Sequence, residues 1–179
     1  MQGIGFYASW KRNFVDSKAS ESFLKIGHPD EEEVERMEPG SIPMGKERIL
    51  LVDDDEIQVI SIRNMLQRLG YKVTAFTDGR EALKVFSEKP YDFDLVITDH
   101  MMPQMMGENL AQEMLRIRSE IPIVLCTGKV DLVPDEEIKE KGLRAYIVKP
   151  FGVRECAELV RGVLDKEEPW KGEIPKYPK

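Results

Sequence analysis

The sequence has few of the features that mark exported, membrane-bound or disulfide-stapled proteins. Its two cysteines, Cys126 and Cys156, are isolated, and no paired spacing indicates a metal site or a disulfide framework. No apolar run approaches the roughly 18 residues of a membrane-spanning helix, and the N-terminus lacks the basic-then-apolar order of a signal peptide. We therefore predict a cytoplasmic protein with no membrane partner.

Positive charge is also scarce. The chain has 26 Lys and Arg against 33 Asp and Glu, a net charge of −7, and no basic stripe is visible. Because a phosphate backbone is bound by clustered Lys and Arg, this balance argues against a nucleic-acid partner. The 179 residues suit one ordinary domain with tails, and a 41% hydrophobic content is typical of a globular protein.

Regular apolar patterning occupies only the middle of the chain. Residues 1–45 contain an aromatic-basic patch, an acidic run and the stretch "GSIPMG", whose Gly, Pro and Ser are typical of a linker. Residues 167–179 contain three prolines and no apolar period. We predict a flexible extension over residues 1–45, a folded domain over residues 46–166, and a tail over residues 167–179.

Five short apolar runs alternate with helical patterns inside the predicted domain. The expected strands are residues 49–52, 72–76, 95–98, 121–127 and 145–149. The expected helices present Val59, Ile62, Leu66 and Leu69 before a stop at Gly70; Leu83 and Phe86; Leu110, Met114 and Ile117; a short segment after Pro134; and Val153, Ala157, Val160 and Leu164. Alternation of this kind predicts a doubly wound α/β domain, a parallel sheet with helices on both faces.

Polar side chains stand where the predicted strands end. Asp53 and Asp54 follow the first strand, Asp99 the third, Thr127 the fourth and Lys149 the fifth. In open α/β sheets, ligands bind outside the carboxyl ends of the strands. Three carboxylates there suit Mg²⁺. With an ammonium and a hydroxyl opposite, they also suit a phosphoryl group, and Asp99 would be the nucleophile.

Some neighbouring residues have simpler explanations. Asp55 and Glu56 stand where a helix begins, where acids complement the positive end of the helix dipole, so we expect them to cap it. The side chain of His100 is expected to alternate away from that of Asp99. Because Mg²⁺ prefers oxygen ligands, we expect His100 to have no direct role. Gly107 suits a position of close backbone approach.

Four stretches resemble a known family. In order, "ILLVDDDE", "LVITDHMMPQMMG", "LCTG" and "AYIVKPF" are similar to the receiver domain of two-component response regulators, over about residues 46–166. The resemblance implies a flavodoxin-like, five-stranded parallel sheet in the order 2-1-3-4-5. It also implies that Asp99 is the phosphoacceptor, charged by a histidine kinase or a histidine phosphotransfer protein.

The resemblance implies further roles. The implied Mg²⁺ ligands are the carboxylates of Asp53, Asp54 and Asp99 and the backbone carbonyl of Met101. Of these, Asp54 binds directly and Asp53 mainly through water. Thr127 and Lys149 would contact the phosphoryl group, Tyr146 would be an aromatic switch, and the Lys149–Pro150 bond would be cis.

Three functions stay open on the residues. The first is a phosphorylatable signalling module, not an enzyme beyond its own phosphotransfer and autodephosphorylation. The second is an Mg²⁺-dependent aspartyl-phosphate hydrolase using Asp53-x-Asp55, which would leave Asp99 without a role. The third is a scaffold that takes no phosphate, against which the complete polar set argues. Little sequence follows the last helix, so we expect output through protein contact, with a phosphorylation-dependent dimer among the options.

Overall fold

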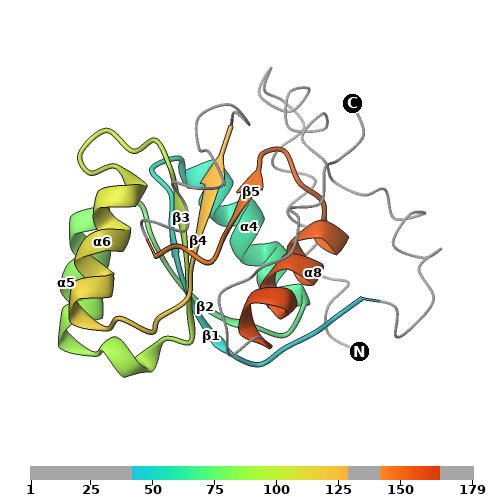
Figure 1. Cartoon of the computed structure of the whole chain (residues 1–179). Coiled ribbons are helices and arrows are strands. Elements are labelled where there is room, and N and C mark those ends of the chain that lie inside the picture. The colour runs from blue at the N-terminus through green and yellow to red at the C-terminus, as the bar shows by residue number, and fades with distance from the viewer. Residues whose placement is uncertain (1–41, 129–141, 166–179) are drawn as a thin grey trace, which may run out of the picture. The chain divides into compact units, whose positions relative to one another are not determined.

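The computed structural model describes residues 42–128 and 142–165, shown in colour in Figure 1. Most of the predicted N-terminal extension, the predicted helix after Pro134 and the whole of the predicted tail lie outside these ranges. The strands are β1 (Arg48–Val52), β2 (Lys72–Phe76), β3 (Leu95–Asp99), β4 (Ile123–Thr127) and β5 (Ala145–Val148). The helices are α4 (Glu56–Arg68), α5 (Gly79–Glu88), α6 (Gly107–Ile117) and α8 (Val153–Leu164), with a 3₁₀ turn, η1 (Pro90–Asp92).

All five strands are parallel and form one sheet in the order β2-β1-β3-β4-β5, which confirms the predicted fold. Helices α4 and α8 cover one face, and α5 and α6 cover the other (Figure 1). The side chains of the interior strand β1 alternate between the two faces, since Ile49 and Leu51 pack under α4 and α8 while Leu50 and Val52 pack under α5 and α6. Burial on both faces explains why the interior strands β1, β3 and β4 are nearly continuous apolar runs.

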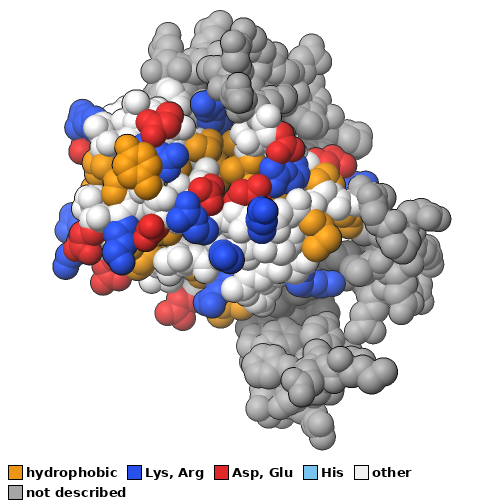
Figure 2. All heavy atoms as spheres, turned by 90° about the horizontal axis from the view of Figure 1, so that it is seen from below, with side chains coloured by type: hydrophobic (Ala, Val, Ile, Leu, Met, Phe, Trp, Pro, Cys, Tyr) orange, Lys and Arg blue, Asp and Glu red, His pale blue; other side chains and the backbone are white. Residues whose placement is uncertain are grey.

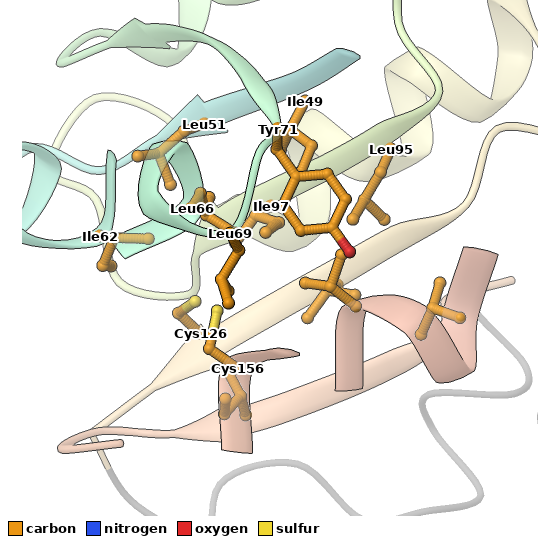
Figure 3. Packing of buried hydrophobic residues seen from close by; sticks show 14 of the residues in the cluster. Ile49, Leu51, Ile62, Leu66, Leu69, Tyr71, Leu95, Ile97, Cys126 and Cys156 are labelled. Atoms are coloured by element: carbon orange, nitrogen blue, oxygen red, sulfur yellow. The ribbon is translucent and has the colours of Figure 1, made fainter. Parts of the chain in front are cut away.

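The predicted apolar stripe of α4 is confirmed, because Val59, Ile62 and Leu66 are buried. Asp55 caps this helix as expected, since its carboxylate accepts hydrogen bonds from the backbone N–H groups of Ile57 and Gln58. Both hydrogen bonds hold the Asp55 carboxylate against the first turn of α4. Figure 3 shows how Leu66 packs with its neighbours beneath the sheet.

One predicted core position is wrong. Ile117, expected on the buried stripe of α6, is 42% exposed. It is the last residue of the helix, and the buried set is Leu110, Ala111 and Met114, with Ala111 taking up the packing one position along. The third stripe position therefore lies at the very end of the helix and does not pack into the core.

Residues ahead of β1 also contact the domain. The Gly45 N–H donates to the Leu69 carbonyl at 3.0 Å, and Glu47 pairs with Arg161 of α8 at 2.7 Å. Gly70, at the end of α4, has a φ of +96°, which glycine adopts readily. A Cβ on Gly70 would lie 2.3 Å from the Gly45 carbonyl oxygen, so this crossing requires glycine.

Within the described ranges, no helix is both long enough and apolar enough to cross a membrane.

Candidate functional site

Three of the predicted site residues meet at the carboxyl edge of the sheet. Asp53 follows β1, Asp99 ends β3 and Lys149 follows β5. The Lys149 ammonium lies 2.5 Å from Asp53 Oδ2 and 2.5 Å from Asp99 Oδ1, so one cation bridges two carboxylates. Both acids are buried, with Asp53 2% and Asp99 9% exposed. The sheet order makes this meeting possible, because β1 lies directly beside β3.

Backbone groups hold each charged side chain in place. The Asp55 N–H donates to Asp53 Oδ1 at 3.0 Å, and the Met101 N–H donates to Asp99 Oδ2 at 2.7 Å. Each carboxylate therefore has one oxygen fixed by backbone and the other directed at Lys149. The Lys149 N–H donates to the Thr127 carbonyl at 2.7 Å, and the Lys149–Pro150 bond is cis, as predicted.

Burial and charge act in opposite directions on these groups. Burial raises the pKa of the Asp53 carboxyl, and this outweighs the lowering by the neighbouring Lys149 ammonium. Burial also lowers the pKa of Lys149, but its hydrogen bonds with Asp53 and Asp99 outweigh that effect and leave the pKa raised. Lys149 therefore stays protonated, and this one ammonium is shared by two buried carboxyl groups.

Two carboxyl groups that share one ammonium suit a further cation, but the expected third carboxylate does not join the cluster. Asp54 is exposed, and in the described residues no three His, Cys, Asp or Glu side chains form a ready-made metal site. Mg²⁺ binds proteins through only one or two carboxylates and keeps several waters. The oxygen donors of Asp53 and Asp99 therefore fit Mg²⁺, with Asp54 on the adjoining turn.

The two predicted switch residues are both buried and share a face of the sheet. Thr127, at the end of β4, is 1% exposed, and Tyr146, on the neighbouring β5, is 9% exposed. Tyr146 packs with Leu125 in the core under α5 and α6. Because side chains two residues apart in a strand point the same way, Thr127 lies on the face where Tyr146 packs.

Sequence reasoning missed one polar contact beside the site. His100 is 5% exposed, and its Nε2 lies 3.0 Å from Glu108 Oε1 at the start of α6. Glu108 was not expected to matter, although an acid in the first turn of a helix was a visible signal. Gly107 makes the expected close approach, since a Cβ there would lie 2.0 Å from the Asp99 carbonyl oxygen.

The fold is a doubly wound parallel sheet with a buried cluster of two carboxylates and one ammonium at its carboxyl edge. The response regulator receiver domain family matches residues 49–161. The match spans more than half of the chain, which therefore belongs to that family. As a receiver domain of a two-component response regulator it is a signalling domain, and members of this family receive phosphate from histidine kinases.

Similar proteins include the probable transcriptional regulator ycf27 of Cyanophora paradoxa, 38% identical over 130 residues that cover 70% of this chain and 51% of that protein. The alkaline phosphatase synthesis transcriptional regulatory protein PhoP of Bacillus subtilis is 35% identical, covering 68% of this chain and 50% of that protein. The chain thus spans about half the length of these relatives. Their names stand in tension with the expectation of no nucleic-acid partner.

Solved structures with the same fold include the chemotaxis protein CheY4 of Vibrio cholerae, with a TM-score of 0.61 and 29% identity over 67% of this chain and 100% of that chain. Another is the receiver domain of the sensor histidine kinase PA1611 of Pseudomonas aeruginosa, with a TM-score of 0.61 and 25% identity over 68% of this chain and 100% of that chain. That structure is described with a magnesium ion coordinated in the active-site cleft.

Proposed function

We propose that this receiver domain accepts a phosphoryl group on Asp99 from the phosphohistidine of a histidine kinase or a histidine phosphotransfer protein. The observation that carries the proposal is the pair of buried carboxylates, Asp53 and Asp99, bridged by Lys149 at the carboxyl edge of the sheet. An Asp99 oxygen forms the new bond to phosphorus as the phosphorus–nitrogen bond of the donor breaks, and the donor imidazole leaves. Because the donor is charged from ATP, the proposal includes a cytoplasmic location.

The other residues have supporting roles in this proposal. Asp53, Asp99, the exposed Asp54 and the Met101 carbonyl would hold Mg²⁺, which neutralises charge on the phosphoryl oxygens when bound. The Lys149 ammonium is already 2.5 Å from Asp99 Oδ1, so it can stabilise negative charge that develops on the phosphoryl oxygens during transfer. The Met101 N–H fixes the second Asp99 oxygen, so the carboxylate is oriented before the donor arrives.

Transmission of the signal falls to Thr127 and Tyr146 in the same proposal. A new dianion on Asp99 draws the Thr127 hydroxyl toward it, because a charge-assisted hydrogen bond is stronger than a neutral one. Tyr146 lies on the same face of the sheet on the neighbouring strand, so its side chain repacks when the Thr127 hydroxyl moves.

We place the output of this domain in protein contact, to a downstream partner or a second copy. On the end of the domain seen from below in Figure 2, Lys and Arg side chains lie among Asp and Glu side chains and form no continuous basic stripe. The names of the relatives point toward transcription, and that remains an alternative readout for any protein that carries this domain.

The hydrolase alternative is weakened by one contact. That mechanism pairs Asp53 as nucleophile with Asp55 as acid, but the Asp55 carboxylate is engaged as the cap of α4, accepting from the Ile57 N–H at 2.8 Å. A capping carboxylate that faces the helix start is poorly placed to protonate a leaving group.

Labelling with radioactive acetyl phosphate, with and without Mg²⁺, tests the proposal. We expect Mg²⁺-dependent label in the wild type and none in Asp99→Asn, which keeps the shape but lacks the nucleophilic oxygen. Asp78→Asn is the matched control, because Asp78 follows β2 at the same edge and caps α5, a role asparagine also fills. Label in Asp99→Asn at the wild-type rate would show that the nucleophile is elsewhere. Rapid turnover of many phosphoesters would indicate a hydrolase, and no label in the wild type a scaffold.

A further inference from the structure

A polar link joins the end of β3 to the start of α6. The His100 side chain is 7% exposed, and its Nε2 lies 3.0 Å from Glu108 Oε1, whose side chain is 18% exposed. Its other ring nitrogen, Nδ1, has no hydrogen-bond partner in the described part of the chain. A buried polar group without partners is costly. Glu108 therefore compensates part of the cost of burying this ring.

Backbone contacts close the same junction. The His100 N–H donates to the Cys126 carbonyl at 2.8 Å, and the His100 carbonyl accepts from the Gly107 N–H at 3.0 Å. Gly107 also lies against the backbone of Asp99, since its Cβ position is 2.0 Å from the Asp99 carbonyl oxygen. The loop of residues 101–106 therefore begins after His100 and is closed by the hydrogen bond from the Gly107 N–H back to the His100 carbonyl.

That loop carries groups that act on Asp99. The Met101 N–H holds Asp99 Oδ2 at 2.7 Å, and the Met101 carbonyl is one of the proposed Mg²⁺ ligands. The Met106 side chain makes no capping hydrogen bond to α6, and the first N–H of that helix, from Gly107, is bonded to the His100 carbonyl instead. A change in how α6 meets β3 would move the Met101 backbone relative to Asp99.

We propose that His100 and Glu108 are a positioning pair that fixes the 101–106 loop and thereby sets the affinity of the Asp99 site for Mg²⁺. This inference rests on the proposed function, because it concerns the same site. Neither side chain is among the proposed Mg²⁺ ligands or the residues proposed to contact the phosphoryl group. Residues that orient metal ligands typically change metal affinity by about tenfold or more when they are removed, and we expect a loss of about tenfold here.

Glu108 could also act simply as a negative charge near the site, and a double-mutant cycle separates the two explanations. If Glu108 acts through His100, Glu108→Ala weakens Mg²⁺ binding in the wild-type background but has little further effect in a His100→Leu background. A simple charge effect would persist in both backgrounds and fade as salt is raised. Glu113→Ala is the matched control, because Glu113 is a carboxylate on the same helix that pairs with Arg116 on the surface.

The cycle is measured in the full chain by two methods that need no phosphodonor. The first is Mg²⁺ titration followed by amide NMR shifts, and the second is hydrogen exchange of the Met101 amide without metal. We expect Glu108→Ala to weaken Mg²⁺ binding about tenfold and to speed Met101 exchange, with Glu113→Ala unchanged. His100→Gln, whose amide can still donate to Glu108, should recover most of the affinity lost in His100→Leu.

Equal Mg²⁺ affinities in the wild type, Glu108→Ala and Glu113→Ala would overturn the inference. So would a loss in Glu108→Ala that persists undiminished beside His100→Leu. Should His100→Leu not fold, His100→Gln takes its place in the comparison: it should bind Mg²⁺ more tightly than Glu108→Ala, and a loss of Mg²⁺ binding equal to that in Glu108→Ala would overturn the link. Wild-type protein that takes no label from acetyl phosphate would instead refute the proposed function, which is a separate outcome.

Discussion

Replacement of Lys149 by methionine is the sharpest test of the charge arrangement at the site. Lys149→Met keeps most of the side-chain volume and removes the ammonium that both Asp53 and Asp99 contact at 2.5 Å. The two carboxylates are then left buried, side by side and without their cation. The metal-free protein should therefore be destabilised far more than by loss of a surface charge.

The magnitude follows from the burial of the cluster. Removing one partner of a buried ion pair costs about 3 to 5 kcal/mol. The Lys149 side chain is 17% exposed, so we expect the lower end of that range, about 3 kcal/mol. In a domain of this size, about 3 kcal/mol lowers the melting temperature by roughly 12 °C. Lys84→Met, an exposed lysine on α5, is the matched control and should change stability by less than about 0.5 kcal/mol.

The penalty should also depend on pH in a definite direction. Burial already raises the pKa of Asp53 above its ordinary value of 3.8, and loss of Lys149 raises it further. A carboxyl whose pKa is raised by folding contributes stability below its unfolded pKa and loses it as the pH rises through the folded pKa. Thus Lys149→Met should be nearly as stable as the wild type at about pH 4 and much less stable at about pH 7.

Thermal and urea unfolding of the metal-free proteins across that pH range provide the measurement. A penalty of the same size at both ends would mean that Lys149 contributes through packing alone, and the electrostatic argument would be wrong. Millimolar Mg²⁺ should restore part of the lost stability at neutral pH, because a divalent cation can replace the missing ammonium charge between the carboxylates.

Three further predictions concern the metal, the readout and the domain boundary. Mg²⁺ at about 100 times its Kd should stabilise the wild type by about 2.7 kcal/mol, and Asp54→Ala should remove most of that gain in thermal unfolding; an indifferent wild type would count against the site. Thr127→Ala should still accept phosphate, but NMR shifts around Tyr146 on adding beryllofluoride should shrink; equal shifts would exclude the switch. A chain of residues 48–165 should be about 2 kcal/mol less stable in urea unfolding than one of residues 42–165, because it loses two backbone hydrogen bonds; equal stability would show that the preceding residues contribute nothing.

The fold was predictable because its signals are local. The strands are short apolar or β-rich runs, so β2 matches the predicted bounds and β1 and β3 differ from them by one residue. The Asp55 cap was predictable for the same reason, since its partners are two and three residues away. Ile117 shows the limit of local reasoning, because a helical stripe does not tell where the helix stops packing on the sheet.

The site was predictable as a set of residues but not as a geometry. The ends of parallel strands meet at one edge, which brought Asp53, Asp99 and Lys149 together as expected. Which of the carboxylates the lysine would bridge depends on the path of the chain after β5. The spacing of residues along the sequence does not predict that path. The contact of His100 with Glu108 depends likewise on how the loop between β3 and α6 returns to the sheet.

The rate at which the two buried cysteines are alkylated can report local unfolding of the domain. Cys126 and Cys156, the only two cysteines of the chain, lie in the same apolar cluster, side by side in Figure 3. Burial raises the pKa of the Cys156 thiol to about 12 and that of Cys126 still further, so neither forms a thiolate in the closed molecule near neutral pH. Alkylating reagents attack thiolates, so modification waits for the sheet and α8 to separate. The rate of thiol modification therefore reads the free energy of that separation directly, and because Cys126 pairs with Asp99 in the sheet register, ligands at the carboxyl edge can be ranked by how far they slow it.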